Sequence, residues 1–336
     1  MSTTSARATQ SRSHTTASAS ALAAGLLAGY AADSILADPS RGHPVALFGK
    51  AARKLENLCY ADSRTRGALY TAVCVGGSAA LGHAVDRAIG PRRGLALAAT
   101  ATAAWTVIGA TSLRREAEAI GELLELGDLP GARERLPRLC GRDARGLTES
   151  ALARAVIESV AENTSDAVVA PLFWGAVAGT PGLLAYRAAN TLDAMVGHRN
   201  SRYQNFGWAS ARLDDVLNLA PARLTGLLTV AAAPTVGGLR QQTWQVLRHD
   251  ARSHPSPNAG HCEASAAGAL GLRLGGTNVY GSRVEERPQL GNGRAPRGFD
   301  IARANRLSKA VCTSAAVLLS AGAVLGRKGS KGLRHG

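Results

Sequence analysis

The sequence predicts an all-α membrane protein, in which about four to six membrane-spanning helices form a bundle and polar helical loops connect them. Three observations predict this fold class. The mean hydropathy is near zero although 46% of the 336 residues are hydrophobic, as expected when apolar blocks alternate with charged ones. Uncharged stretches of membrane length recur, and lysine and arginine, 39 against 24 acidic residues, gather in the polar connections. This composition excludes a collagen-like chain, a disulfide-stapled miniprotein and a globally disordered polyampholyte.

The uncharged stretches give the positions of the expected helices. A helix needs roughly 20 residues to cross about 30 Å of hydrocarbon. Three stretches have 19 or 20 uncharged residues, and two shorter ones have 16 and 17. The expected spans lie at residues 21–32, between Arg66 and Asp86, between Arg93 and Arg114, between Asp166 and Arg187, between Arg223 and Arg240, and between Lys309 and Arg327.

Small residues dominate these stretches, for example Ala96–Trp105. Small side chains let membrane helices approach closely, so the composition suits a packed bundle. An alanine-rich soluble helical protein is the alternative that composition alone leaves open, because its buried helices would also lack charge.

Polar segments complete the expected organisation. Residues 1–20 contain 11 Ser or Thr and no acid, which predicts a disordered tail. Residues 21–326 are expected to form a single membrane domain with a polar helical insertion at 113–165, and residues 327–336 a basic tail. The basic loop after the first span is expected on the cytoplasmic side.

Other residue types narrow the choice of partner. The arginines are dispersed, no zinc-finger or RNP pattern occurs, and the 4% of aromatic residues do not interleave with basic ones, so we expect no nucleic-acid partner. The five cysteines form no Cys-x-x-Cys pair and are interpreted as core residues in a reducing compartment. The spacing of His254, His261 and Cys262 matches no standard metal site, so we do not interpret these residues as metal ligands.

The first polar block follows the first expected span. Asp38, Arg41 and His43 lie among two prolines and a glycine, which force a non-helical connection and orient these side chains. A structural turn with a capping aspartate is the alternative interpretation.

The second block carries three acids at helical spacing. Glu158, Glu162 and Asp166 recur at i, i+4 and i+8, which would stack three carboxylates on one helix face. Such a stripe is repulsive unless a cation lies on it, and oxygen ligands suit Mg²⁺, so the pattern indicates a metal–phosphate site. The alternative is a solvated face paired with Arg154.

The third block follows the expected span that ends at Arg187. Asn190 and Asp193 share a helix face, and His198 and Arg199 follow a glycine that is expected to end the helix. Ionisable residues beside a membrane-length segment are costly unless they line a polar cavity, which favours function.

Two further blocks offer ligands for metal or phosphate. Asp214 and Asp215 provide adjacent carboxylates near Asn218, and Arg212 could clamp a phosphate or carboxylate. Residues 255–260 prescribe a rigid proline- and glycine-containing loop that could approach an anion. No Walker A motif or dinucleotide fingerprint occurs.

Together these blocks resemble the CobD/CbiB family of cobalamin biosynthesis. The resemblance covers roughly residues 20–326 in the family's order. Its motifs are Asp38-Pro39 with His43-Pro44-Val45, Glu158-Ser-Val-Ala-Glu-Asn-Thr-Ser-Asp166, Tyr186-Arg-Ala-Ala-Asn-Thr-Leu-Asp-Ala-Met195, Phe206-Gly with Ala211-Arg-Leu-Asp-Asp-Val-Leu-Asn218, and Pro255-Ser-Pro-Asn-Ala-Gly260.

The resemblance implies a multi-pass inner-membrane adenosylcobinamide-phosphate synthase. Such an enzyme joins adenosylcobyric acid to (R)-1-aminopropan-2-ol or its O-phosphate through an amide, with ATP and Mg²⁺. Membrane lipid and other membrane-bound cobalamin-assembly enzymes are the implied partners. Forming an acyl phosphate makes the poorly reactive carboxylate an acyl donor, which requires a metal, cations around phosphate and a base for the amine.

The implied roles fall into three groups. The chain has Ala46 where the family often has a basic residue, so we assign no role to that position. Catalytic roles are expected for Glu158, Glu162, Asp193 and His198; substrate or phosphate binding for Arg41, His43, Arg187, Asn190, Arg199, Arg212, Asn218, Ser256 and Asn258; and metal binding for Glu162, Asp166, Asp214 and Asp215.

Topology limits this assignment. If residues 167–186 cross the membrane fully, the second and third blocks face opposite sides, whereas Pro171 and Pro181 favour a broken or re-entrant segment. The alternative functions are a Mg²⁺-dependent intramembrane transferase and a membrane transporter. The sequence shows neither the two comparable Asp-rich helices of a prenyltransferase nor the inverted repeats of a transporter.

Overall fold

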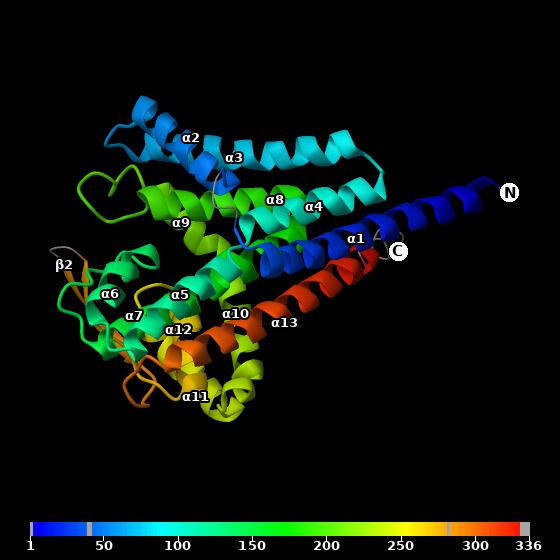
Figure 1. Cartoon of the computed structure of the whole chain (residues 1–336). Helices are drawn as coiled ribbons and strands as arrows, with labels where there is room; N and C mark the ends of the chain where they lie inside the picture. Colours follow the sequence, from blue (N-terminus) through cyan, green and yellow to red (C-terminus); the bar gives the residue numbers. More distant parts are fainter. Residues whose placement is uncertain (1–2, 39–41, 281–282, 330–336) are drawn as a thin grey trace. The chain divides into compact units, whose positions relative to one another are not determined.

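The computed structural model describes residues 3–38, 42–280 and 283–329, and there the chain is almost entirely α-helical (Figure 1). The predicted all-α class is confirmed. One antiparallel hairpin, β1 (Leu274–Tyr280) with β2 (Arg283–Leu290), accompanies the helices. The helices are α1 (Thr3–Leu36), α2 (Pro44–Cys59), α3 (Arg64–Ile89), α4 (Arg93–Val107), α5 (Ala110–Glu125), α6 (Leu129–Arg135), α7 (Glu149–Thr164), α8 (Ala170–Val196), α9 (Trp208–Leu217), α10 (Leu219–Ala232), α11 (Arg240–Asp250), α12 (Ala259–Leu270) and α13 (Asp300–Gly329).

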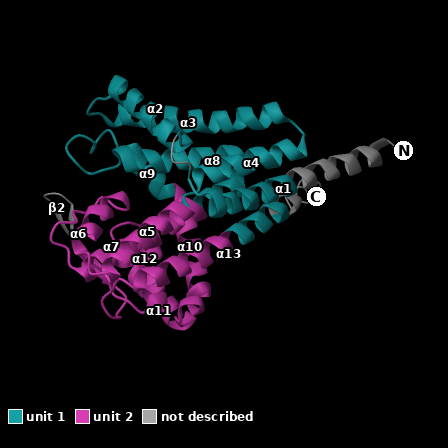
Figure 2. Cartoon of the chain, in the orientation of Figure 1, with its two compact units in different colours: residues 1–109, 170–216, 316–336 teal, residues 110–169, 217–315 magenta. Residues whose placement is uncertain are grey.

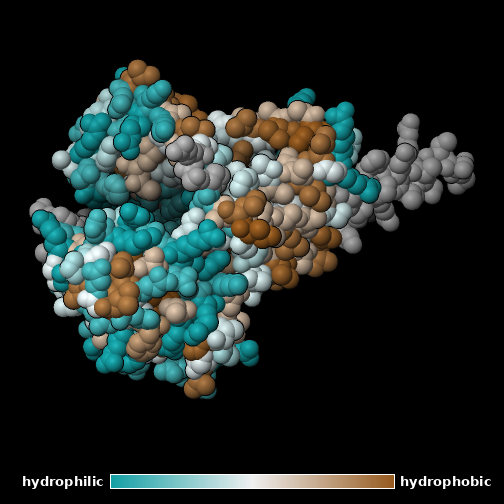
Figure 3. Space-filling view, viewed as in Figure 1, coloured by the Kyte–Doolittle hydropathy of each residue, from teal (hydrophilic) through white to brown (hydrophobic). Residues whose placement is uncertain are grey.

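Among the described residues, six helical segments are long and apolar enough to cross a membrane, the upper limit of the expected number. On α3, Leu69, Val73 and Leu81 are 52–62% exposed, and Figure 3 shows apolar surface gathered over α3 and α4. A soluble helical protein would bury such side chains, so the membrane interpretation is preferred. The six segments are Ala19–Leu36, Arg64–Ile89, Arg93–Glu125, Glu149–Val196, Leu219–Val236 and Asp300–Leu325, and each overlaps an expected span.

The chain forms two compact units (Figure 2). The sequence predicts one domain over residues 21–326, whereas the structure builds each unit from segments far apart in the chain. The predicted polar insertion at 113–165 falls in unit 2. Unit 1 comprises residues 1–109, 170–216 and 316–336, and unit 2 comprises residues 110–169 and 217–315.

Helix α1 begins at Thr3, so helix occupies most of the segment that the sequence predicts to be disordered. Residues 1–20 contain neither proline nor glycine, so nothing in them ends a helix that extends backwards from the apolar stretch. The predicted basic tail at 327–336 lies largely outside the described residues.

Close packing between small residues builds unit 1. A Cβ atom on Gly29 of α1 would lie 2.4 Å from the Cβ atom of Ala104 on α4. Helix α3 meets α8 in the same way, since a Cβ atom on Gly82 would lie 2.7 Å from the Cα atom of Pro181. These contacts need glycine, which agrees with a bundle packed through small residues.

Helix α8 is broken inside its membrane-length segment. Gly179 has φ 69° and ψ −150°, which favours glycine, and Pro181 follows. A Cβ atom on Gly175 would lie 2.9 Å from Cδ2 of Leu183. An uninterrupted helix would separate these two residues by about 12 Å, so the chain folds back at Gly179. The predicted broken segment is confirmed, and a segment that reverses need not carry the chain across a membrane.

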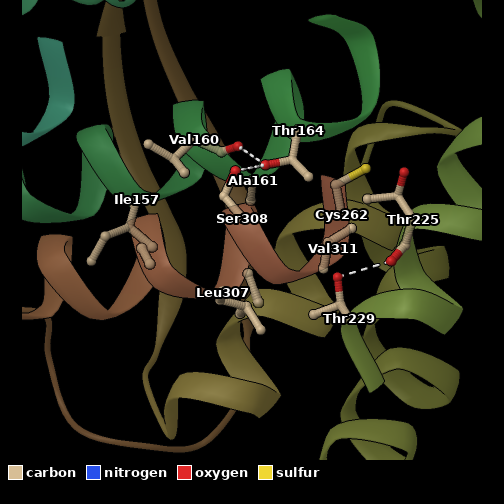
Figure 4. Close-up of a pocket in the computed structure, with 12 residues that line it drawn as sticks. Ile157, Val160, Ala161, Thr164, Thr225, Thr229, Cys262, Leu307, Ser308 and Val311 are labelled. Atoms are coloured by element: carbon tan, nitrogen blue, oxygen red, sulfur yellow. Dashed lines mark hydrogen bonds between the residues drawn. The ribbon is translucent and has the colours of Figure 1, made fainter. Parts of the chain in front are cut away.

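Helices α7 and α12 lie at the centre of unit 2. Most of α7 is buried, and every residue of α12 from Cys262 to Leu270 is buried. Figure 4 shows a cavity of about 20 Å³ lined by α7, α10, α12 and α13, where the hydroxyl groups of Thr164 and Ser308 lie 2.7 Å apart. This cavity has room for about one water molecule, so it is no substrate site.

Candidate active site

The carboxylate of Glu158 is buried and closely paired in unit 2. Its side chain is 2% exposed, and Arg142, 6% exposed, donates to Oε2 at 2.6 Å. The backbone N–H of Gly275 in β1 donates to Oε1 at 2.7 Å. Arg154 approaches Oε1 to 3.9 Å and donates to the carbonyls of Gly275 and Thr277. Cations therefore compensate this member of the predicted stripe, and Glu158 ties the hairpin to α7.

The other two acids of the predicted stripe face α12. Glu162 lies on α7, but α7 ends at Thr164, and Asp166 lies in a single π-turn over Ser165–Val169. The expected α-helical spacing therefore stops before Asp166, because a π-turn changes the repeat. Burial raises the pKa of the Cys262 thiol on α12, and the charges of Asp166 and Glu162 raise it further, which locates both acids near α12.

Glu263 on α12 is a buried acid that the sequence interpretation did not single out. Its side chain is fully buried, and its Oε1 lies 3.6 Å from Nε2 of His254 and 3.7 Å from Nη1 of Arg287. Burial raises the pKa of Glu263 well above its ordinary value, and Glu162 and Glu158 raise it further by repulsion. Burial lowers the pKa of His254, and Arg287 adds to this effect. The group is thus a dense set of ionisable side chains in a buried site.

The loop before α12 holds His254 in one orientation. The backbone N–H of Ser256 donates to Nδ1 of His254 at 3.0 Å, and the same Nδ1 atom lies 3.3 Å from the carbonyl oxygen of Ser256. The Ser256 hydroxyl accepts from the N–H groups of Asn258 and Ala259, which begin α12. Asn258 accepts from Arg223 at 3.4 Å. The predicted binding residues Ser256 and Asn258 therefore have structural contacts, and a role in substrate binding stays a prediction for them, as it does for the buried Asn218.

A second set of predicted residues comes together in unit 1, where α8 faces α9. Arg187 donates to Asn190 at 3.4 Å, and Asn190 donates to Asp214 at 3.3 Å. Arg212 lies 3.8 Å from Asp215. Burial raises the pKa of Asp215, against the lowering effect of Arg212 and of Arg199. This chain of contacts alternates cation, amide and carboxylate.

Asp193 belongs to the same set. Its charge interacts with that of Asp215, and a Cβ atom on Gly197 would lie 2.0 Å from its Oδ1 atom, so the glycine makes room for the carboxylate. His198 and Arg199 follow in the exposed loop after α8. Asn190, Asp193 and both α9 acids therefore form one group, and a catalytic role for His198 stays a prediction.

The first predicted block caps a helix. His43, rather than an aspartate, is the N-cap of α2, and its Nδ1 atom accepts from the N–H of Val45 at 3.2 Å. Its Nε2 atom lies 3.4 Å from Asp38. Arg41 lies outside the described residues. The alternative of a structural turn is thus partly correct for this block, although the capping residue differs.

A basic cavity of about 750 Å³ opens in unit 1 beside this block. Lys50 and Arg53 of α2 line it together with His43 and with Arg187 of α8. Lys50 and Arg53 are one turn apart on the exposed face of α2. The sequence interpretation missed both, although their i, i+3 spacing after the His-Pro motif was the signal. Asp38 also lines the cavity, so three permanent cations face one carboxylate, and the excess of positive charge favours an anionic ligand.

No set of three or more His, Cys, Asp or Glu side chains is arranged to hold a metal ion in the described part of the chain. The predicted metal ligands divide into Glu162 and Asp166 in unit 2 and Asp214 and Asp215 in unit 1. Mg²⁺ is often held by one or two carboxylates together with substrate phosphates and water. The α9 pair beside the cations of unit 1 fits that mode of binding better than a metal cage made of protein alone.

Comparisons with known proteins agree on one family. The family model described as CobD/Cbib protein matches residues 26–308. "Cobalamin biosynthesis protein CobD" of Mycobacterium tuberculosis strain H37Rv is 51% identical over 296 residues, which cover 88% of this chain and 94% of the relative. The protein of that name from Rhodobacter capsulatus is 43% identical over 84% of this chain and 90% of its own. No solved structure matches the chain.

Proposed function

The chain belongs to the CobD/CbiB family and acts in cobalamin biosynthesis, and on that premise we propose that it is an ATP-dependent amide-forming ligase of the cell membrane. Its substrates would be adenosylcobyric acid and (R)-1-aminopropan-2-ol or its O-phosphate. The six membrane-length segments support a multi-pass location. Membrane lipid and other membrane-bound enzymes of cobalamin assembly are the proposed partners.

The observation that carries the proposal is the group of acids beside cations in unit 1. Arg187 lines the basic cavity and also contacts Asn190, which contacts Asp214. Phosphoryl transfer to a carboxylate needs cations around the phosphate and acids that hold a metal. Bound Mg²⁺ and ATP would supply the phosphoryl group and neutralise its charge. Asp214 and Asp215 would hold the metal.

The cations of unit 1 would position the anionic groups. Lys50, Arg53 and Arg187 would bind phosphate in the cavity, and Arg199 and Arg212 would hold the corrin carboxylate near the α9 acids. Guanidinium groups suit both roles because they match the geometry of carboxylate and phosphate oxygens.

Reconstitution with defined substrates tests the proposal. The purified protein in detergent is incubated with adenosylcobyric acid, Mg²⁺ and ATP, and with either aminopropanol or its phosphate, and the corrinoids are separated by mass. We expect an amide product that needs ATP. The proposal is refuted if no amide forms with either amine. The variants Glu162→Gln and Asp193→Asn should each lower the rate, and Glu134→Gln, an exposed acid of α6, serves as the control.

A further inference from the structure

We propose that Glu263 and Glu162 form the binding site for the primary ammonium group of the amine substrate. The inference rests on the proposed function for the identity of that amine, and it assigns to Glu263 a role that the sequence motifs do not give it. It also assigns Glu162 to amine binding, so that Asp214 and Asp215 of α9 are the proposed metal ligands.

Glu263 stands out because its fully buried carboxyl group has a second acid, Glu162, beside it and no cation within hydrogen-bonding distance among the described residues. Neither of its oxygens accepts a hydrogen bond from a donor in the described part of the chain. His254 and Arg287 point toward Oε1, yet both stay beyond hydrogen-bonding distance, at 3.6 and 3.7 Å. A buried polar group without a hydrogen-bond donor is costly unless a ligand or another group supplies one. Among the described residues the second oxygen, Oε2, also accepts no hydrogen bond from an N–H group or a cation, which leaves Glu162 as the close neighbour of this carboxyl group.

Glu162 supplies the second carboxylate and marks the side from which a ligand would reach Glu263. Helix α7 packs against α12, and the charge of Glu162 acts directly on Glu263. Glu162 is partly exposed, whereas Glu263 is fully buried. A ligand would therefore meet Glu162 first and then reach Glu263. A cation between two facing carboxylates removes their repulsion and satisfies the open oxygens.

Two features favour an ammonium group over a divalent metal. Arg287 already lies beside Oε1, and its charge would repel a doubly charged ion more strongly than a singly charged one. The described acids also include no arranged set of three metal ligands. A primary ammonium carries one charge and three donors, which suits two carboxylates.

Direct binding measurements on the full chain in detergent test the site without catalysis. The probe is (R)-1-aminopropan-2-ol, the uncharged control ligand is propane-1,2-diol, and dissociation constants come from ligand-observed NMR. We expect wild-type protein to prefer the amine, and Glu263→Gln to weaken amine binding about 10- to 100-fold while diol binding is unchanged, since hydrogen bonds to charged groups contribute about 1.5–3 kcal/mol. Glu134→Gln, the same chemical change on an exposed acid, should bind as wild type does.

Each other outcome has a defined meaning. Equal amine binding by wild type and Glu263→Gln overturns the proposal, and so does failure of wild type to prefer the amine over the diol. Mn²⁺ binding that is lost in Glu263→Gln and unaffected by amine, followed by electron paramagnetic resonance, would identify a metal site instead. If Glu263→Gln does not fold, Glu162→Gln replaces it, with the same expected loss.

The site and the proposed function fail separately. Amine binding that depends on Glu263, without any ATP-dependent corrinoid product, leaves the ammonium site standing and removes the ligase proposal. If the protein forms the amide and Glu263→Gln keeps the wild-type KM for the amine, the ligase proposal stands and the ammonium site is refuted.

Discussion

The ion pair between Arg142 and Glu158 leads to a sharp stability prediction. Both side chains are buried, at 6% and 2% exposure, and their charged atoms are 2.6 Å apart. Arg142→Met leaves the carboxylate in place with the Gly275 N–H as its remaining close donor. Removing one partner of a buried ion pair typically costs about 3–5 kcal/mol, because the other charge stays buried without compensation. We expect a loss of that size in the free energy of unfolding.

Unfolding in mixed micelles with increasing dodecyl sulfate measures the loss of stability, and two further variants serve as comparisons. Arg145→Met breaks a pair of similar length, 2.7 Å to Asp143, but Arg145 is 87% exposed, so its midpoint should match that of wild type. The double variant Arg142→Met/Glu158→Leu removes both charges and should be more stable than Arg142→Met alone. The reasoning is refuted if Arg142→Met unfolds at the same midpoint as Arg145→Met, or if the double variant is the least stable.

Two further predictions concern the cavity and the broken helix. The cavity is expected to hold a phosphate-bearing substrate, ATP or aminopropanol phosphate, and Lys50→Ala and Arg53→Ala should each raise the KM of that substrate about tenfold with kcat unchanged. The control Lys54→Ala changes a cation outside the cavity lining and should leave this KM unchanged. Equal KM values for all three variants would contradict the assignment. In a variant without native cysteines, Arg145→Cys and Asn200→Cys should react with a membrane-impermeant maleimide from the same side, because α8 reverses at Gly179; reaction from opposite sides would show that the segment crosses the membrane.

The spans could be predicted from sequence because charged side chains are excluded from long apolar helices. All six expected stretches coincide with helices of membrane length. The break in α8 was also visible, since Pro181 interrupts the helical pattern. The division into two units was not, because it depends on contacts between segments far apart in the chain, and neither composition nor spacing records such contacts.

The candidate site was predictable where its residues share one local motif. Asn190 and Asp193 lie one turn apart, and the structure brings both toward α9. Glu263 was not predictable in this way, because it stands alone in an apolar helix and its neighbours His254 and Arg287 come from a loop and a strand. The available signal in the sequence was a lone acid in an otherwise apolar, alanine-rich helix. Only the structure shows that this acid is buried.

The most direct test of the central claim is the mass of the corrinoid that the purified protein produces. Adenosylcobyric acid, Mg²⁺ and aminopropanol or its phosphate are incubated with and without ATP. We expect the corrinoid to gain the mass of the amine minus one water, only when ATP is present, and at a much lower rate with Asp193→Asn than with Glu134→Gln. An unchanged corrinoid in the complete mixture, with protein that is folded and monodisperse, would contradict the claim that this membrane protein is an amide-forming ligase.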